Sequence, residues 1–197
     1  MKFAAVVLAA GRSTRMQANK LLADLNGRPL LATTIEQIQA SGVDEIVVVT
    51  GHDAEAVASA LSHTKVVITH NPQYADGLST SVRCGIAAAK NFDAAFICLG
   101  DMPLIRGADM QRMMQAFNVE QGRKVIAPTY RCQLGNPVLW GQEHFTTLMA
   151  LEGDRGARSL LEAQREQITE IAVDHDGVLL DADTPEALAE IRKRSAN

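Results

Sequence analysis

Residues 3–20 read FAAVVLAAGRSTRMQANK, an apolar run followed at once by a loop rich in cations. The run from Phe3 to Leu8 has the length of one β-strand and lacks polar alternation, which is typical of a strand buried on both faces. The loop over residues 9–20 holds one glycine and three cations. In an open α/β sheet, ligands bind beyond the carboxyl ends of the strands, so this loop is the first candidate binding segment.

The same alternation of apolar runs and amphipathic stretches continues along the chain. Three further runs, rich in β-branched residues, are EIVVVT at 45–50, KVVIT at 65–69 and AAFICL at 94–99. We expect helices from Pro29 to near Gly42 and after Asp53, Ser79 and Gly107, since proline suits a first turn and Asp53 and Ser79 suit helix caps. This order predicts an α/β fold with a doubly wound, mostly parallel sheet of the Rossmann-like type.

The second half of the sequence is less regular. We expect strands over residues 125–128, 136–140, 168–173 and 178–180, and helices over 157–166 and 185–193. No repeat, low-complexity tract or linker interrupts the chain. We therefore expect one domain over residues 1–197.

The composition excludes several classes of function. The formal net charge is -4 with no basic run, which disfavours binding to duplex nucleic acid or anionic lipid. The apolar start is short for a signal peptide, and no stretch approaches the ~20 apolar residues of a membrane-spanning helix. The odd, scattered cysteines favour reduced thiols in a cytoplasmic protein. The histidines lack metal-ligand spacing and are interpreted as surface or loop residues: His52, His63, His70, His144 and His175.

The loop over residues 9–20 has the chemistry of a phosphate-binding segment. Gly11 lets backbone N–H groups approach an anion, and nearby arginine and lysine side chains neutralise its charge. The sequence lacks both the glycine–lysine–serine/threonine ending of a Walker loop and the three glycines of a dinucleotide fingerprint. Such a loop suits a triphosphate better than a dinucleotide, although a solvated basic loop would have the same composition.

Six motifs follow one another in a fixed order. They are LAAGRSTRM…K at 8–20, HNPQYADGLSTSVRCG at 70–85, GDMP at 100–103, GNPV at 135–138, GDRGAR at 153–158 and DADTPEAL at 181–188. Together they resemble the MobA-like nucleotidyltransferase superfamily, and most closely its molybdenum cofactor cytidylyltransferases (the MocA group). The resemblance covers nearly the whole chain.

This resemblance implies a reaction and a set of site residues. It implies that CMP passes from CTP to the terminal phosphate of the molybdopterin cofactor, with release of pyrophosphate and with Mg²⁺, or Mn²⁺, as cofactor. Lys20 and Arg15 would act on the triphosphate, and Asp101, also catalytic, would bind the metal with Asp183. The implied nucleotide contacts are Leu8, Ala9, Ala10, Gly11, Arg12, Ser13, Lys20, Gly77, Ser79, Ser81 and Gly100. Because the acceptor phosphate is already anionic, no general base is required.

Two aspartates also have structural interpretations. Asp101 follows the run at 94–99 directly, where a carboxylate can bind Mg²⁺ together with waters and phosphates, but an aspartate before Met-Pro is also common in turns. Asp183 fits the metal by resemblance, but an Asp-Thr-Pro segment also starts helices. Likewise, the hydroxyls of residues 77–82 suit either a base or ribose contact or a helix cap.

Ala10 bears on the choice of nucleotide. Guanylyltransferase relatives tend to carry glycine there, and a methyl group narrows the pocket, so we expect CTP rather than GTP. Gln17, where the family usually has glycine, and Cys132 and Leu134, before GNPV, depart from the pattern and leave the acceptor less defined. The alternatives are a related transferase using GTP or a sugar-phosphate acceptor, and a non-catalytic cofactor-binding chaperone for a molybdenum hydroxylase. The resemblance to the MocA group also implies transient contact with such a hydroxylase.

Overall fold

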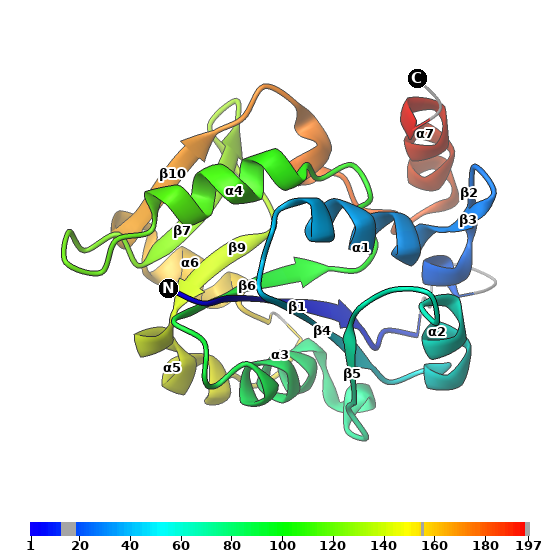
Figure 1. Ribbon diagram of the computed structural model, residues 1–197, viewed down its shortest axis with the longest axis horizontal. Helices are drawn as coiled ribbons and strands as arrows, with labels where there is room; N and C mark the ends of the chain where they lie inside the picture. The colour runs from blue at the N-terminus through cyan, green and yellow to red at the C-terminus, as the bar shows by residue number, and fades with distance from the viewer. Residues whose placement is uncertain (13–18, 155, 196–197) are drawn as a thin grey trace.

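The computed structural model describes residues 1–12, 19–154 and 156–195. Its centre is a mostly parallel sheet in the order β10-β7-β9-β6-β1-β4-β5, with β8 paired to β7 (Figure 1). Only β9 of the main strand path runs antiparallel to its neighbours, β6 and β7, among the described residues. The strands are β1 Phe3–Ala9, β4 Glu45–Thr50, β5 Val67–His70, β6 Ala94–Leu99, β7 Val125–Tyr130, β8 Gln133–Leu134, β9 Val138–Gly141 and β10 Ile168–Ala172, with a separate ribbon of β2 Asp24–Leu25 and β3 Arg28–Pro29.

Helices cover both faces of the sheet, which confirms the predicted α/β class. In Figure 1, α1 and α4 lie above the sheet, and α3 and α5 lie below it. The helices are α1 Leu30–Ala40, α2 Ala54–Ala60, α3 Leu78–Ala88, α4 Gly107–Ala116, α5 Phe145–Met149, α6 Arg158–Ala163 and α7 Pro185–Ser195. Short 3-10 turns are η1 Lys20–Leu22, η2 Tyr74–Asp76, η3 Gln142–His144, η4 Arg165–Gln167 and η5 Asp176–Leu179.

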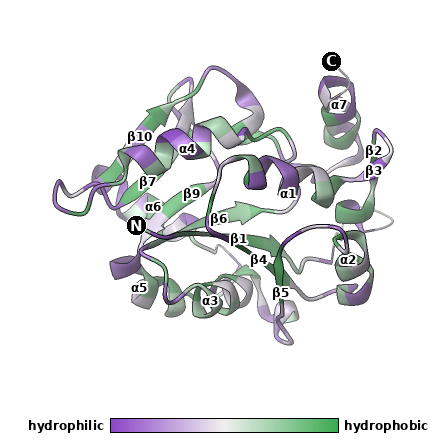
Figure 2. Cartoon of the chain, in the orientation of Figure 1, coloured by the Kyte–Doolittle hydropathy of each residue, from purple (hydrophilic) through white to green (hydrophobic). Residues whose placement is uncertain are grey.

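Two apolar clusters fill the spaces between the sheet and its helices. One joins Ile35 of α1 and Met113 of α4 to one face of the sheet, and the other joins Ile86 of α3 and Leu148 of α5 to the opposite face. Figure 2 shows the central strands as hydrophobic and the outer sides of the helices as hydrophilic, as this packing requires. Within the described ranges, no helix is long and apolar enough to cross a membrane.

The register of the central strands fixes where the loops lie. β1 is paired in parallel with both β4 and β6, and Ala9 stands opposite Thr50 while Leu8 stands opposite Leu99. These three strands therefore end at one edge of the sheet. The loops that follow them lie side by side there, although they are far apart in sequence.

Two expectations about strands were wrong. The segment at 178–180 pairs with no named strand in the described chain, and residues Asp176–Leu179 form η5 instead. Val178 is buried, and its carbonyl accepts a hydrogen bond of 2.8 Å from the Asn136 amide, so packing on a loop accounts for the apolar residues. The run at 65–69 is also not buried on both faces, because β5 is an edge strand and Val67 is 45% exposed.

Candidate active site

A cavity of about 440 Å³ lies at the edge where β1 and β6 end. It collects many of the residues expected from the sequence: Leu8, Ala10, Gly11, Arg12, Lys20, Gly77, Ser81, Asp101 and Asp183. Ala9, Ser79 and Gly100 are buried beside it and do not line it. Ser13 and Arg15 lie outside the described residues, as does Gln17.

Sequence reasoning missed several residues that line the same cavity. They are Leu21, Tyr74, Ala75, Leu78, Leu99, Asp154 and Asp181. Most of them stand inside or beside motifs already singled out, such as HNPQYADG, GDRGAR and DADTP. The sequence motifs therefore indicated which segments form the cavity. They do not indicate which side chains within a motif point into it.

Lys20 joins two aspartates that come from distant parts of the chain. Its ammonium nitrogen lies 2.5 Å from Oδ2 of Asp101, two residues after β6, and also contacts Oδ1 of Asp183, before α7. The side chains of Lys20 and Asp101 are 16% and 10% exposed, whereas that of Asp183 is 42% exposed. The fold thus brings one cation and two carboxylates together in the lining of the cavity.

The pKa shifts reflect this concentration of charge. Burial acts to lower the pKa of Lys20, but the charges of Asp101 and Asp183 and their hydrogen bonds outweigh burial and raise it. Burial, followed by the negative charges of Asp101 and Asp183, raises the pKa of Asp181. These four side chains combine one ammonium with three carboxylates, an arrangement that attracts further positive charge.

The contacts of Asp101 and Asp183 bear on their alternative roles, as metal ligands or as a turn residue and a helix cap. The cap of α7 is made by Thr184, whose Oγ1 accepts a hydrogen bond of 3.2 Å from the Ala187 amide. The backbone carbonyl of Asp101 accepts a 3.0 Å bond from the Ala182 amide, which ties the GDMP turn to the segment before α7. The carboxylates of Asp101 and Asp183 are turned to Lys20 instead.

The same carboxylates fit a divalent cation that is shared with substrate. Among the described residues, no group of three or more His, Cys, Asp or Glu side chains is arranged to hold a metal ion. Asp101 and Asp183 contact one nitrogen atom and so lie close enough to share one small cation. Carboxylate oxygens are hard ligands suited to Mg²⁺ or Mn²⁺, and Mg²⁺ usually completes its shell with water and phosphate oxygens.

The start of α3 forms another wall of the cavity. Gly77 has φ 109° and approaches the 153–154 segment so closely that a Cβ atom would lie 2.7 Å from Oδ1 of Asp154. The N-cap position is Gly77 and the helix begins at Leu78, two residues earlier than a Ser79 cap would place it, so the expected Ser79 cap was wrong. Ser81 lines the cavity, and its hydroxyl accepts a hydrogen bond of 3.1 Å from Asn71.

A comparison with known proteins places the chain in a family. Residues 5–168 match the MobA-like NTP transferase domain. The chain belongs to this family. This confirms the resemblance to the superfamily that the six motifs carried.

Several individual proteins are similar to this MobA-like domain. The bifunctional protein GlmU of Pelobacter propionicus is 32% identical over 142 residues, which is 71% of this chain and 30% of GlmU. The chain thus spans about 30% of the length of that curated relative. Among solved structures, a nucleotidyl transferase from Methanothermobacter, Mth528, has a TM-score of 0.87 at 25% identity and covers 100% of this chain and 99% of its own. Rv0371c of Mycobacterium tuberculosis, solved in complex with manganese, has a TM-score of 0.80 at 28% identity. The match covers 98% of this chain and 99% of the Rv0371c chain.

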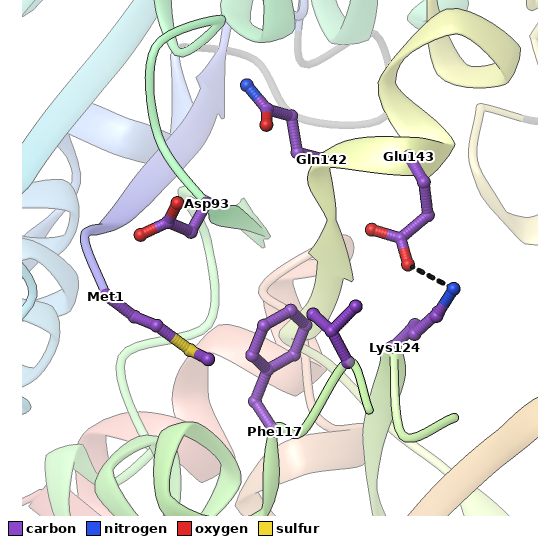
Figure 3. A pocket seen from close by; sticks show the side chains of 7 residues that line it. Met1, Asp93, Phe117, Lys124, Gln142 and Glu143 are labelled. Carbon is purple, nitrogen blue, oxygen red and sulfur yellow. Dashed lines mark ion pairs between the residues drawn. The ribbon is translucent and has the colours of Figure 1, made fainter. Parts of the chain in front are cut away.

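A second hollow of about 480 Å³ lies at the opposite edge of the MobA-like domain, where β1, β6 and β7 begin. Figure 3 shows Lys124 and Glu143 paired there, beside Asp93, Gln142, Phe117 and Met1. The ion pair measures 3.1 Å, and Asp93 accepts a 2.6 Å hydrogen bond from the Lys2 amide. None of the described residues that the sequence marked as functional lines this hollow.

His175 lies in a loop, as expected, but it is not at the surface. The loop precedes η5, and the His175 side chain is only 11% exposed. Its Nε2 lies 2.7 Å from Oδ2 of Asp109 in α4, and its Nδ1 accepts a 3.1 Å bond from the Gly177 amide. The ring therefore connects α4 to the chain segment that leads to Asp181 and Asp183.

Proposed function

We propose that this MobA-like domain is a nucleotidyltransferase that moves CMP from CTP to the terminal phosphate of the molybdopterin cofactor and releases pyrophosphate. The observation that carries the proposal is the convergence of Lys20, Asp101 and Asp183 in a cavity that also includes the phosphate-loop residues Gly11 and Arg12. The family supports the reaction class. The choice of CTP and of the molybdopterin acceptor rests on the sequence resemblance and on the size of Ala10.

Placement and charge neutralisation account for most of the chemistry. An oxygen of the acceptor phosphate attacks the α-phosphorus of the nucleotide, the bond from that phosphorus to the bridging oxygen breaks, and pyrophosphate carries the electron pair away. Backbone amides around Gly11 and the ammonium of Lys20 would face the negative charge of the triphosphate. The acceptor oxygen is already anionic at neutral pH, so the chain need not supply a base.

Asp101 and Asp183 would hold the divalent cation. When bound, the cation supplies Lewis acidity and neutralises phosphate charge. The manganese complex of Rv0371c supports the use of a divalent cation by a related chain. Mg²⁺ and Mn²⁺ are both suited to these oxygen donors, and Mg²⁺ is the proposed physiological ion.

Ala10 supports the preference for CTP. Its side chain lines the cavity and is only 5% exposed. A Cβ atom added to Gly51 would lie 2.8 Å from the Ala10 methyl group, so that methyl is closely packed from behind. A fixed methyl group at this wall reduces the space for a base, which favours a pyrimidine over a purine.

A thermal-shift screen of CTP, GTP, ATP and UTP with Mg²⁺ tests the nucleotide. We expect the largest rise in melting temperature with CTP, because a ligand at ~100 times its Kd adds roughly 2.7 kcal/mol of stability. Ala10→Gly, compared within the same screen, should raise the GTP response relative to the CTP response. A larger response to GTP in the unaltered protein would contradict the CTP assignment.

Pyrophosphate release tests the acceptor. We expect release when CTP, Mg²⁺ and molybdopterin cofactor are present together, and little release when a sugar phosphate replaces the cofactor. Release only with a sugar phosphate would identify a transferase with another acceptor. Binding of cofactor without any release would favour the chaperone role, and delivery to a molybdenum hydroxylase would then be the activity to measure.

A further inference from the structure

The loop over residues 9–20, called the phosphate loop below, has two described ends, residues 9–12 and 19–20. Both ends are contacted by neighbouring loops that have no role in the proposed reaction. At the first end, the His52 amide donates a hydrogen bond of 3.2 Å to the Ala10 carbonyl. The guanidinium carbon of Arg12 lies 5.4 Å from the centre of the Tyr74 ring. At the second end, Nδ2 of Asn19 donates a 3.2 Å bond to Oδ2 of Asp53. Residues 51–53 and Tyr74 thus contact the loop before and after residues 13–18.

Asp53 has an unusual conformation for the residue before a helix. It stands at the N-cap position of α2, as the sequence predicted, but the structure gives it no side-chain cap bond. Its φ is 52°, in the left-handed region that costs a non-glycine residue free energy. The carboxylate lies near Asn19 and, at 3.5 Å, near Nε2 of His52. Asp53 therefore contacts the phosphate loop instead of capping its own helix.

Asn19 transmits this contact to Lys20. Its Oδ1 accepts a hydrogen bond of 3.1 Å from the Leu21 amide, which caps the η1 turn that begins at Lys20. The amide group of Asn19 thus bonds Asp53 through its nitrogen and η1 through its oxygen. The position of η1 sets the backbone from which Lys20 reaches Asp101 and Asp183. A chain of contacts therefore runs from Asp53 through Asn19 and η1 to the ammonium of Lys20.

Tyr74 contacts the other end of the loop, at Arg12. It lines the cavity and lies against Gly51, where a Cβ atom would be 2.5 Å from the Tyr74 Cβ. Glycine at 51 is therefore what allows the ring to approach Ala10 and Arg12. A guanidinium over an aromatic face is attracted by the ring electrons. With its side chain on Tyr74, Arg12 can present its backbone amide to a phosphate, the role that the family resemblance implies.

We propose that Asp53 and Tyr74 are positioning residues that preorganise the phosphate loop for the metal–nucleotide complex, Asp53 by orienting Lys20 and Tyr74 by fixing Arg12. The inference rests on the proposed function, since it requires that the loop bind a nucleoside triphosphate. Side chains that are already held in place, here Arg12 and Lys20, lose less entropy on binding and present their charges more accurately.

The decisive variant is Asp53→Gly. Glycine adopts positive φ without strain, and no side-chain cap is lost, so the melting temperature should stay the same or rise. The value of kcat for pyrophosphate release should nevertheless fall roughly tenfold, because Lys20 loses the hydrogen-bonded support of Asn19. Asp53→Asn keeps an acceptor oxygen and tolerates the left-handed region, so it should recover most of the lost kcat.

A matched control separates strain relief from positioning. Asn26 has φ 57° in an exposed turn and does not line the cavity. Asn26→Gly should therefore change stability as Asp53→Gly does but leave kcat unchanged. For the other end of the loop, Tyr74→Leu should weaken Mg–CTP binding by about threefold in calorimetry, whereas Tyr74→Phe should retain affinity because the ring is kept.

The outcomes distinguish the inference from the function on which it rests. If the unaltered protein binds no Mg²⁺–nucleoside triphosphate in calorimetry, the proposed function fails and this inference fails with it. If the unaltered protein turns over and Asp53→Gly matches it in kcat, only the positioning role is overturned. Equal losses of kcat and of melting temperature in Asp53→Gly and Asp53→Asn would likewise overturn it and leave a purely structural role.

Discussion

The two hollows of the molecule are nearly equal in volume, about 440 Å³ at the carboxyl edge of the sheet and about 480 Å³ at the opposite edge. They differ in how their charges are matched. In the second hollow, Lys124 meets Glu143 as one cation and one anion, each about one-third exposed. At the carboxyl edge, Lys20 is shared by two carboxylates with Asp181 nearby. We place the proposed active site at the carboxyl edge because its converging charges are not matched one to one; the two cavity volumes do not distinguish the edges.

Removing one charge from the carboxyl edge should give the largest effect on activity. Asp101→Asn keeps the shape of the side chain but removes a carboxylate from Lys20 and from the proposed metal site. We expect kcat for pyrophosphate release to fall by roughly 10²–10³, with the far-UV circular dichroism spectrum unchanged. Glu143→Gln in the second hollow is the control and should keep the original kcat. Near-normal turnover by Asp101→Asn would remove the distinction between the two hollows.

The regular strands that end at the carboxyl edge were predictable from the local sequence pattern. The runs at 45–50 and 94–99 coincide with β4 and β6, because short apolar segments without polar alternation are typical of strands buried on both faces. The irregular segment at 178–180 was not predictable, since an apolar triplet gives the same signal whether it pairs in a sheet or packs on a loop. Sequence pattern therefore fixed the scaffold better than the connections.

The candidate site was partly predictable, for a different reason. The motifs indicated Lys20, Asp101 and Asp183, and the structure brings these three together. Whether Asp183 or Thr184 caps α7 was not decidable from the string, because both carry an acceptor oxygen near the helix start. The three-dimensional structure shows that the Asp183 carboxylate contacts Lys20. The same holds for Asp53, whose cap position did not reveal its contact with Asn19.

Removing the ammonium of Lys20 is expected to have a smaller effect, and on stability instead of rate. The size of this effect should depend on whether a divalent metal ion is present. Lys20→Met retains the aliphatic length and leaves Asp101, Asp181 and Asp183 without their common ammonium. We expect a loss of about 1–3 kcal/mol in the free energy of unfolding, because hydrogen-bonded charge is left uncompensated. Mg²⁺ or Mn²⁺ should then raise the melting temperature more in Lys20→Met than in the unaltered protein.

This experiment has its own control and its own contrary result. Chelation with EDTA should return Lys20→Met to its low melting temperature, and Asp101→Asn should show a reduced response to the metal. Equal metal-induced shifts in the unaltered protein and in Lys20→Met would mean that the cation binds elsewhere. The proposed pairing of Asp101 and Asp183 around a divalent ion would then be wrong.

The smallest expected effect belongs to the second hollow. Partial burial acts to raise the pKa of Glu143, but hydrogen bonds from its own backbone amide and from Lys124, together with the charge of Lys124, outweigh burial and lower it. A depressed folded-state pKa means that the stabilisation is present above the ordinary pKa and is lost as pH falls through the folded value. Since the pair is about one-third exposed, Glu143→Gln should cost at most about 0.5 kcal/mol at neutral pH.

Urea unfolding midpoints of Glu143→Gln and the unaltered protein, compared at neutral pH and at about pH 3, measure this contribution. The difference between the two proteins should shrink at the acidic pH, because a larger fraction of the unaltered glutamate is protonated there and its pairing with Lys124 is weakened. A difference that persists there would arise from packing near Gly141, whose Cβ position would lie 2.6 Å from Oε2 of Glu143. If kcat stays unchanged while the midpoint difference varies with pH, the paired charges of this hollow act on stability alone, and the shared charges at the other edge remain the ones tied to turnover.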